Sequence, residues 1–175
     1  VTLHPQVRDR LHEIEKIVIT THESAIRIIS KQGPLANAAD RDHCLQYMTA
    51  VPLAFGNLVA EQYEDDFHAA HPIIDELREK MVIVEDPRYT REYLEADKRS
   101  IANAIQVFFN DGTSTQQVVV QYPIGHRRRR AEGIALLEEK FKANLATRFA
   151  RQRCAEIFAI CKNQAALEAN TANGS

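Results

Sequence analysis

The stretch IANAIQVFFNDGTSTQQVVVQY, residues 101–122, contains the strongest local structural signal in the chain. Two segments rich in Val, Ile and Phe, Ile101–Phe109 and Thr113–Tyr122, flank the tripeptide Asn110-Asp111-Gly112. An Asp-Gly pair is typical of tight hairpin turns, because glycine accepts the positive φ angle that such turns need. The stretch therefore predicts two antiparallel strands joined by a turn, and with them a β-sheet.

Outside this hairpin, strand-like and helix-like patterns alternate along the chain. Ile14–Thr21 and Met81–Glu85 have the β-branched composition of strands. Asp86–Lys98 is charged and carries two tyrosines, and we expect a surface connection there. Five segments have the spacing of amphipathic helices, namely Glu23–Lys31, Asn37–Phe55, Pro72–Lys80, Glu132–Phe149 and Arg151–Ala166. These elements predict an α+β fold, a mostly antiparallel four-stranded sheet with helices on one face, followed by C-terminal helices.

The composition excludes two classes of partner. The 175 residues carry a net charge of −2 at pH 7, and this slightly acidic balance argues against a nucleic-acid partner. No apolar run approaches the roughly 18 residues that a membrane-spanning helix needs, so we expect no membrane partner. One domain with appended helices accounts for the length.

The three cysteines, Cys44, Cys154 and Cys161, form no pair that suggests a disulfide or a metal site. On a helix Cys154 and Cys161 would be separated by two turns, roughly 10 Å in rise, which is too far for a disulfide. Zinc and iron–sulfur sites need more ligands at closer spacing. We therefore expect reduced thiols, no metal, and a cytoplasmic protein.

The segment Gly33–Met48 combines a turn, a helix start and two chemically active side chains. Asn37 to Asp40 offer caps for a helix that should end at Gly56. On that helix His43 and Tyr47 would share one face, because residues four positions apart are neighbours. Such a pair suits an active-site wall, but it is more commonly a hydrogen-bonded structural pair, and the residues alone leave both explanations open.

Three segments of the chain resemble the MmgE/PrpD family, in particular its 2-methylcitrate dehydratase branch. They are KQGPLANAADRDHCLQYM at residues 31–48, EDPRYTREYLEADKRSIANAI at residues 85–105 and QYPIGHRRRRAEGI at residues 121–134. The segments occur in the family's order and spacing, and the resemblance extends from Glu13 to Leu167. The decarboxylase branch has a motif similar to A-R-H-S-F-Q-Y, with an arginine where this chain has Asp42. That difference favours the dehydratase branch. The alternative is that this chain is a structural or binding module of a cis-aconitate decarboxylase-like protein.

The resemblance implies a hydro-lyase of propionate catabolism that converts 2-methylcitrate into 2-methyl-cis-aconitate without a cofactor. It also implies that this chain is the C-terminal fragment of a longer enzyme. We expect the fragment to be inactive by itself and the whole enzyme to be a homodimer. Residues 1–130 would form a small, lid-like α/β domain, residues 131–168 helices that pack on a helical domain, and residues 169–175 a frayed tail. The apolar residues expected to face that helical domain are Ile134, Leu137, Phe141, Leu145, Ile157 and Ile160.

The resemblance places Tyr47 in the active site, and we take His43 with it as a catalytic candidate. We expect the Tyr47 hydroxyl to line a cleft. A tricarboxylate substrate needs cations and close backbone approach, so the substrate-binding candidates are Lys31, Gly33, Arg127 and Arg128. A surface lysine beside a helix-stopping Gly-Pro, and a solvated arginine-rich loop, are the structural alternatives for these four residues.

Overall fold

The computed structural model describes residues 2–172, and contacts within the chain divide them into two units. The sheet unit extends to Pro123 and the helical unit begins at Ile124. The elements of the sheet unit are α1 (His4–Val7), η1 (Leu11–Glu13), β1 (Ile14–Thr21), α2 (Glu23–Ile29), α3 (Ala38–Asp42), α4 (Leu45–Phe55), η2 (Ala60–Tyr63), α5 (Asp65–Ala70), α6 (Ile73–Glu79), β2 (Met81–Glu85), α7 (Pro87–Leu94), β3 (Asn103–Phe109) and β4 (Val118–Val120). Those of the helical unit are η3 (Arg127–Arg129), α8 (Arg130–Ala146), α9 (Arg151–Cys161) and α10 (Gln164–Ala172).

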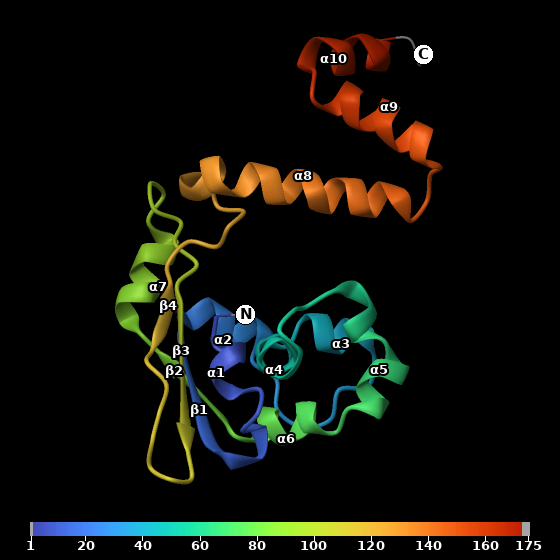
Figure 1. Cartoon of the computed structure of the whole chain (residues 1–175). Helices are drawn as coiled ribbons and strands as arrows, with labels where there is room; N and C mark the ends of the chain where they lie inside the picture. Colours follow the sequence, from blue (N-terminus) through green and yellow to red (C-terminus); the bar gives the residue numbers. More distant parts are fainter. Residues whose placement is uncertain (1, 173–175) are drawn as a thin grey trace. The chain divides into compact units, whose positions relative to one another are not determined.

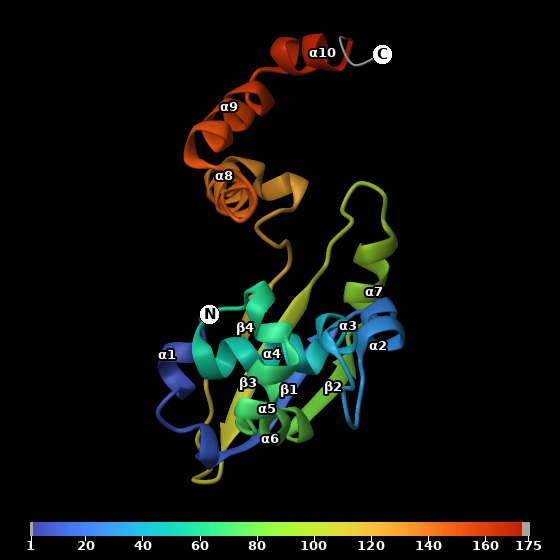
Figure 2. The same ribbon diagram turned by 90° about the vertical axis from the view of Figure 1, so that its right-hand side faces the viewer.

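The four strands form one sheet in the order β2-β1-β3-β4 (Figure 2). The β1–β3 and β3–β4 pairs are antiparallel and the β1–β2 pair is parallel, so the α+β prediction with a mostly antiparallel sheet is confirmed. The predicted hairpin turn is present. Gly112 has a φ angle of +80°, its amide donates to the Phe109 carbonyl at 3.0 Å, and the Phe109 amide donates to the Thr113 carbonyl at 2.9 Å. The second strand of the hairpin is shorter than predicted and is limited to Val118–Val120.

The core of the sheet unit lies between the sheet and the helices α4 and α6. Ile17 and Ile19 of β1 are fully buried, as are Val51 of α4 and Leu77 of α6, and all of them belong to one apolar cluster. Figure 1 shows α4 and α6 on the same side of the sheet. Successive side chains of β1 point to opposite faces of the sheet, and those on one face, including Ile17 and Ile19, enter this layer.

One helix departs from the predicted arrangement. Residues 87–94, expected as part of a surface connection, form α7, which lies on the other side of the sheet (Figure 1). The Asp86 side chain accepts a hydrogen bond from the Arg88 amide at 2.8 Å, and Pro87 occupies the first turn, a combination that starts helices. Tyr89 packs with Ala102 and Ala104 in a second apolar cluster. The expectation that all helices cover one face was therefore wrong for α7.

The helical unit contains two long predicted segments, one of which is interrupted. The helix expected over Arg151–Ala166 breaks into α9 and α10, because the Asn163 side chain accepts a bond from the Ala166 amide at 3.1 Å and caps a new helix. On α8, Ile134 and Leu137 are each 45% exposed, whereas Leu145 is buried. Of the predicted tail, residues 169–172 belong to α10, and residues 173–175 lie outside the described residues. The predicted domain boundary after residue 130 stays a prediction.

Candidate functional site

A pocket of the sheet unit lies beside the segment that follows α2. It has a volume of about 430 Å³. The residues that line it come from that segment, from α4, from α6 and from the start of β2: Lys31, Gln32, Gly33, Pro34, Gln46, Asp75, Arg78, Glu79 and Met81. Gly33 has a φ angle of +78°, which only glycine adopts without strain, so the chain can turn here around the pocket. The pocket therefore brings together two of the predicted substrate-binding residues, Lys31 and Gly33.

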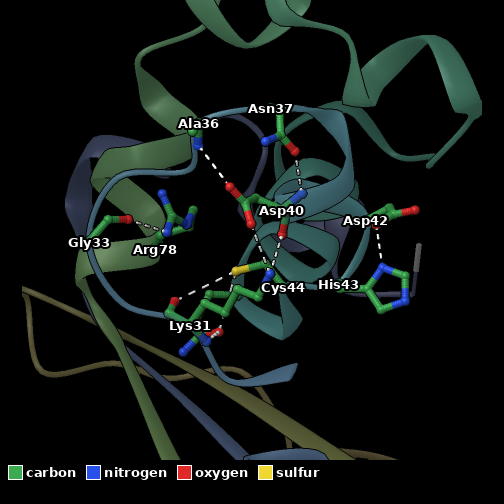
Figure 3. A network of polar contacts seen from close by, with 10 residues as sticks. Lys31, Gly33, Ala36, Asn37, Asp40, Asp42, His43, Cys44 and Arg78 are labelled. Atoms are coloured by element: carbon green, nitrogen blue, oxygen red, sulfur yellow. Dashed lines mark hydrogen bonds and ion pairs between the residues drawn. The ribbon is translucent and has the colours of Figure 1, made fainter. Parts of the chain in front are cut away.

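Lys31 is held at both its side chain and its backbone (Figure 3). Its Nζ donates to Oδ1 of Asp40 at 3.2 Å, and this bond is the main reason that the pKa of Asp40 lies below its ordinary value. The Lys31 amide donates to Oε1 of Gln46 at 3.1 Å, and the Cys44 thiol lies 3.6 Å from the Lys31 carbonyl. The ammonium group is only partly exposed and is thus fixed at the pocket wall.

Arg78 is a pocket residue that the sequence analysis missed. Its side chain is only 7% exposed. Nη2 donates to the Gly33 carbonyl at 2.8 Å, Nη1 donates to Oδ1 of Asp75, and Nε is buried without a hydrogen-bond partner among the described residues. Its position in the sequence is the signal that could have identified it. Arg78 follows Ile74 by four residues, so the two side chains share the buried face of α6.

A buried polar chain connects Arg78 to the interior of the sheet unit. Arg41 is 1% exposed, and its Nη1 lies 3.3 Å from Nδ1 of His68, while Nε2 of His68 lies 3.0 Å from Oδ2 of Asp75. The Arg41 guanidinium also donates to the Tyr63 carbonyl at 2.6 Å and pairs with Asp65. Two buried cations are in this way each matched with a carboxylate, which is the usual condition for burying charge.

Tyr47 lies in the core and not at a cleft. Its side chain is fully buried, and its hydroxyl donates to the Gln62 carbonyl at 2.7 Å. Burial raises the pKa of Tyr47 to about 12, and the ring contacts His68 edge-on with a centroid distance of 5.6 Å. The expectation of an accessible hydroxyl was therefore wrong for this chain, because Tyr47 packs against η2 and α5 through Gln62, Tyr63 and His68.

His43 does not share a helix face with Tyr47. The predicted single helix is interrupted, since α3 ends at Asp42 and Cys44 has an extended backbone before α4 begins. His43 therefore caps the end of α3, with its side chain 67% exposed and Nδ1 in contact with the adjacent carboxylate of Asp42 (Figure 3). The contacts of Cys44 and Gln46 with the Lys31 backbone explain the break.

Arg127 and Arg128 belong to the helical unit, where they form the exposed start of η3. His126 caps this turn, because its Nδ1 accepts a bond from the Arg128 amide at 3.1 Å. Their predicted contact with substrate stays a prediction. The predicted Asn37 cap of α3 is confirmed, with the side chain accepting a bond from the Asp40 amide at 2.9 Å.

Within residues 2–172 no cluster of His, Cys, Asp and Glu side chains is suited to hold a metal ion. The three cysteines are free thiols. Over the same range, no helix has the length and apolar character that crossing a membrane requires.

Comparison with known proteins agrees with the resemblance seen in the sequence. Residues 1–164 match the model of the MmgE/PrpD C-terminal domain. The chain is 56% identical to 2-methylcitrate dehydratase of Cupriavidus necator over 161 residues, which are 92% of this chain and 33% of the relative. It is 54% identical to 2-methylcitrate dehydratase of Salmonella typhimurium, with 89% of this chain and 32% of the relative covered. A mitochondrial 2-methylcitrate dehydratase of Yarrowia lipolytica is 52% identical, with 84% of this chain and 28% of the relative covered.

The chain thus spans about a third of the length of these curated relatives. The match with the family model covers nearly all of its residues. The chain belongs to the MmgE/PrpD family, in which it corresponds to the C-terminal domain.

Proposed function

We propose that this chain, within a protein of its relatives' length, takes part in the dehydration of 2-methylcitrate to 2-methyl-cis-aconitate. The observation that carries the proposal is a pocket lined by Lys31 and Gly33 in a domain that is 56% identical to a named 2-methylcitrate dehydratase. The proposed substrate is a small tricarboxylate, and the proposed reaction class is that of a hydro-lyase.

The reaction removes a proton α to a carboxylate and expels a tertiary hydroxyl group. It needs a base, an acid that protonates the leaving oxygen, and cations that hold the carboxylates. The Lys31 ammonium is a suitable cation, because Asp40 fixes its position at the pocket wall. Arg127 and Arg128 stay our proposals for further carboxylate contacts.

Tyr47 and His43 stay our proposals for proton transfer. The raised pKa keeps the proton on Tyr47, and a direct role requires its hydroxyl to exchange the Gln62 carbonyl for the substrate. His43 presents an exposed ring that Asp42 orients through Nδ1, the arrangement of an oriented general base.

A chimaeric enzyme tests the proposal. The chain replaces the matching third of the Cupriavidus necator relative, and formation of the conjugated double bond is followed by ultraviolet absorbance. We expect turnover of 2-methylcitrate by the chimaera and none by the 175-residue chain alone. Release of carbon dioxide from cis-aconitate is measured in parallel, because it would indicate the decarboxylase alternative. A folded chimaera that does not dehydrate 2-methylcitrate would refute the proposal.

Two variants of the chimaera examine the named residues. Lys31→Gln should raise KM for 2-methylcitrate by about tenfold, since one charge-assisted contact is lost. Tyr47→Phe should lower kcat by roughly 10²-fold, the loss expected for a positioned proton donor. Near-normal kcat in the latter variant would remove Tyr47 from the mechanism.

We also propose that the whole protein is a cytoplasmic homodimer. The three free thiols support a reducing compartment. The exposed apolar side chains of Ile134 and Leu137 on α8 support their predicted packing against a helical domain of the whole protein, because such surface tends to be buried against a partner. Measurement of the solution mass tests the dimer, and cell fractionation tests the location.

A further inference from the structure

We propose that Arg78 forms a bidentate carboxylate subsite in the pocket and that Asp75 and His68 are its positioning residues. The ligand class is a di- or tricarboxylate, one of whose carboxylates replaces the Gly33 carbonyl on the Arg78 guanidinium. The inference rests on the proposed function for the identity of the substrate, and it assigns roles to three residues that the comparisons leave without one.

The guanidinium of Arg78 presents an incompletely used edge. Nε and Nη2 of an arginine carry parallel N–H bonds, which match the two oxygens of a carboxylate. In the structure Nη2 donates to the Gly33 carbonyl at 2.8 Å, whereas Nε is buried and has no partner among the described residues. The Gly33 carbonyl therefore pairs with only one of the two donors on an edge that can bind a carboxylate. The other donor is buried without a partner, which is unfavourable.

Gly33 permits the exchange. Its φ angle is +78°, and no heavy atom lies within 4 Å of the position that a Cβ would occupy. The segment beside it, including Lys31 and Pro34, lines the same pocket. A rotation of the Gly33 peptide would withdraw its carbonyl from Arg78 and leave both donors of the edge to the carboxylate.

The hydrogen-bonding groups left over at the pocket favour an anion over a cation as the ligand. Both oxygens of Asp75 are engaged, Oδ1 by Arg78 and Oδ2 by His68, so this carboxylate does not face the ligand as a free acceptor. Glu79 is exposed and its charge is screened by solvent. Lys31 and Arg78 keep N–H donors beyond those that bind Asp40, Asp75 and Gly33.

His68 sets the position of Asp75. An arginine only donates, so Nδ1 of His68, 3.3 Å from Nη1 of Arg41, is the acceptor, and Nε2 carries the proton that is donated to Asp75 at 3.0 Å. Asp75 then holds Nη1 of Arg78, which leaves the opposite edge of the guanidinium for the ligand. The buried Arg41 thus fixes the tautomer of His68, and His68 fixes the carboxylate that orients Arg78.

The pocket has a suitable size for this ligand class. Its volume of about 430 Å³ falls in the range of roughly 300 to 1,000 Å³ that is typical of small-molecule sites. Lys31 lies in the same lining and can hold a second carboxylate of the same molecule. A molecule with several carboxylates therefore suits the pocket better than a monocarboxylate.

The test is titration of the ¹⁵N-labelled 175-residue chain with propane-1,2,3-tricarboxylate, with the uncharged triamide as control ligand. We expect a saturable shift of the Arg78 Nε–H resonance with the tricarboxylate and none with the triamide. Arg78→Lys keeps the positive charge but removes the two parallel N–H donors of the guanidinium, and should weaken binding by about tenfold. Arg27→Lys, which changes an exposed arginine on α2, is the matched control and should leave binding unchanged.

Two variants of His68 separate positioning from folding. The amide of His68→Gln can donate to Asp75 as Nε2 does, so this variant should bind almost as the parent does. The shorter His68→Asn reaches Arg41 and not Asp75, and should weaken binding by at least about threefold while its amide spectrum stays dispersed. Equal binding by these two variants would overturn the positioning role, and unchanged binding by Arg78→Lys would overturn the subsite.

The outcomes for the subsite and for the proposed function are distinct. If the parent chain does not bind the tricarboxylate at concentrations that saturate the chimaeric enzyme with substrate, the subsite is refuted, although an active chimaera still supports dehydration. If the chain binds the tricarboxylate through Arg78 and the chimaera is inactive, the subsite stands and the proposed reaction is refuted.

Discussion

Replacement of Gly133 by alanine should open the start of the helical unit. Gly133 lies in the first turn of α8, and a Cβ built on it would approach the Ile124 carbonyl oxygen to 2.3 Å and the carbonyl carbon to 3.3 Å. The Ile124 backbone would have to move by about 1 Å before these contacts became ordinary. Because the neighbour is backbone, we take the upper end of the overpacking cost, about 3 kcal/mol, less about 1 kcal/mol for the better helix propensity of alanine.

The net loss of about 2 kcal/mol should raise the population of the opened segment by about 30-fold. Limited digestion with trypsin measures this population, since Arg127, Arg128, Arg129 and Arg130 lie between the two contacting residues. Gly125→Ala is the control, because no heavy atom lies within 4 Å of its Cβ position. Equal rates of cleavage in the two variants would show that the close approach of Ile124 to Gly133 does not hold this segment.

Three further predictions concern the sheet unit. Gly112→Val should destabilise it by about 1 to 2 kcal/mol, because a β-branched residue resists a φ of +80°, whereas Gly112→Asn should cost less; urea unfolding of both variants checks this, and equal losses would contradict it. Tyr47→Phe should cost about 1 to 2 kcal/mol in the same assay, since the buried Gln62 carbonyl loses its donor at 2.7 Å, and unchanged stability would show that this bond is not formed. Burial lowers the pKa of His22, so the unfolded chain takes up this proton first and stability should fall as the pH drops below about 6.5. His22→Asn keeps a capping side chain and should flatten the decrease in melting temperature between about pH 7 and about pH 5; an unchanged slope would exclude His22 as its cause.

The strands and the hairpin could be predicted because their signals are local. Ile14–Thr21 and Met81–Glu85 are strands at the predicted residues, and Gly112 supplies the positive φ angle of the turn. Asp86-Pro87 is also a local signal for the start of helix α7, although the high charge of the segment favours a surface connection. Local capping chemistry outweighed composition in that case.

The site was less predictable because tertiary contacts determine it. No glycine or proline marks the break between α3 and α4, where the Lys31 amide donates to Gln46 and the Cys44 thiol contacts the Lys31 carbonyl. The same break separates His43 from Tyr47 and turns Tyr47 into the core. Arg78 carries no motif, and its importance follows only from the side chains that surround it.

The parallel pairing of β1 with β2 ties the formation of the pocket to a late folding event. The connection between these strands, residues 22–80, carries every residue that lines the pocket except Met81, and Met81 pairs with Ile17 at the start of β2. Closing a connection of about 60 residues costs chain entropy before the strand contacts compensate for it, so such pairings form slowly. A refolding chain that has formed only the local β3–β4 hairpin has no ligand site. In stopped-flow refolding, recovery of ligand binding should therefore follow the rate at which the β2 edge docks, and not the faster rate at which helical signal returns.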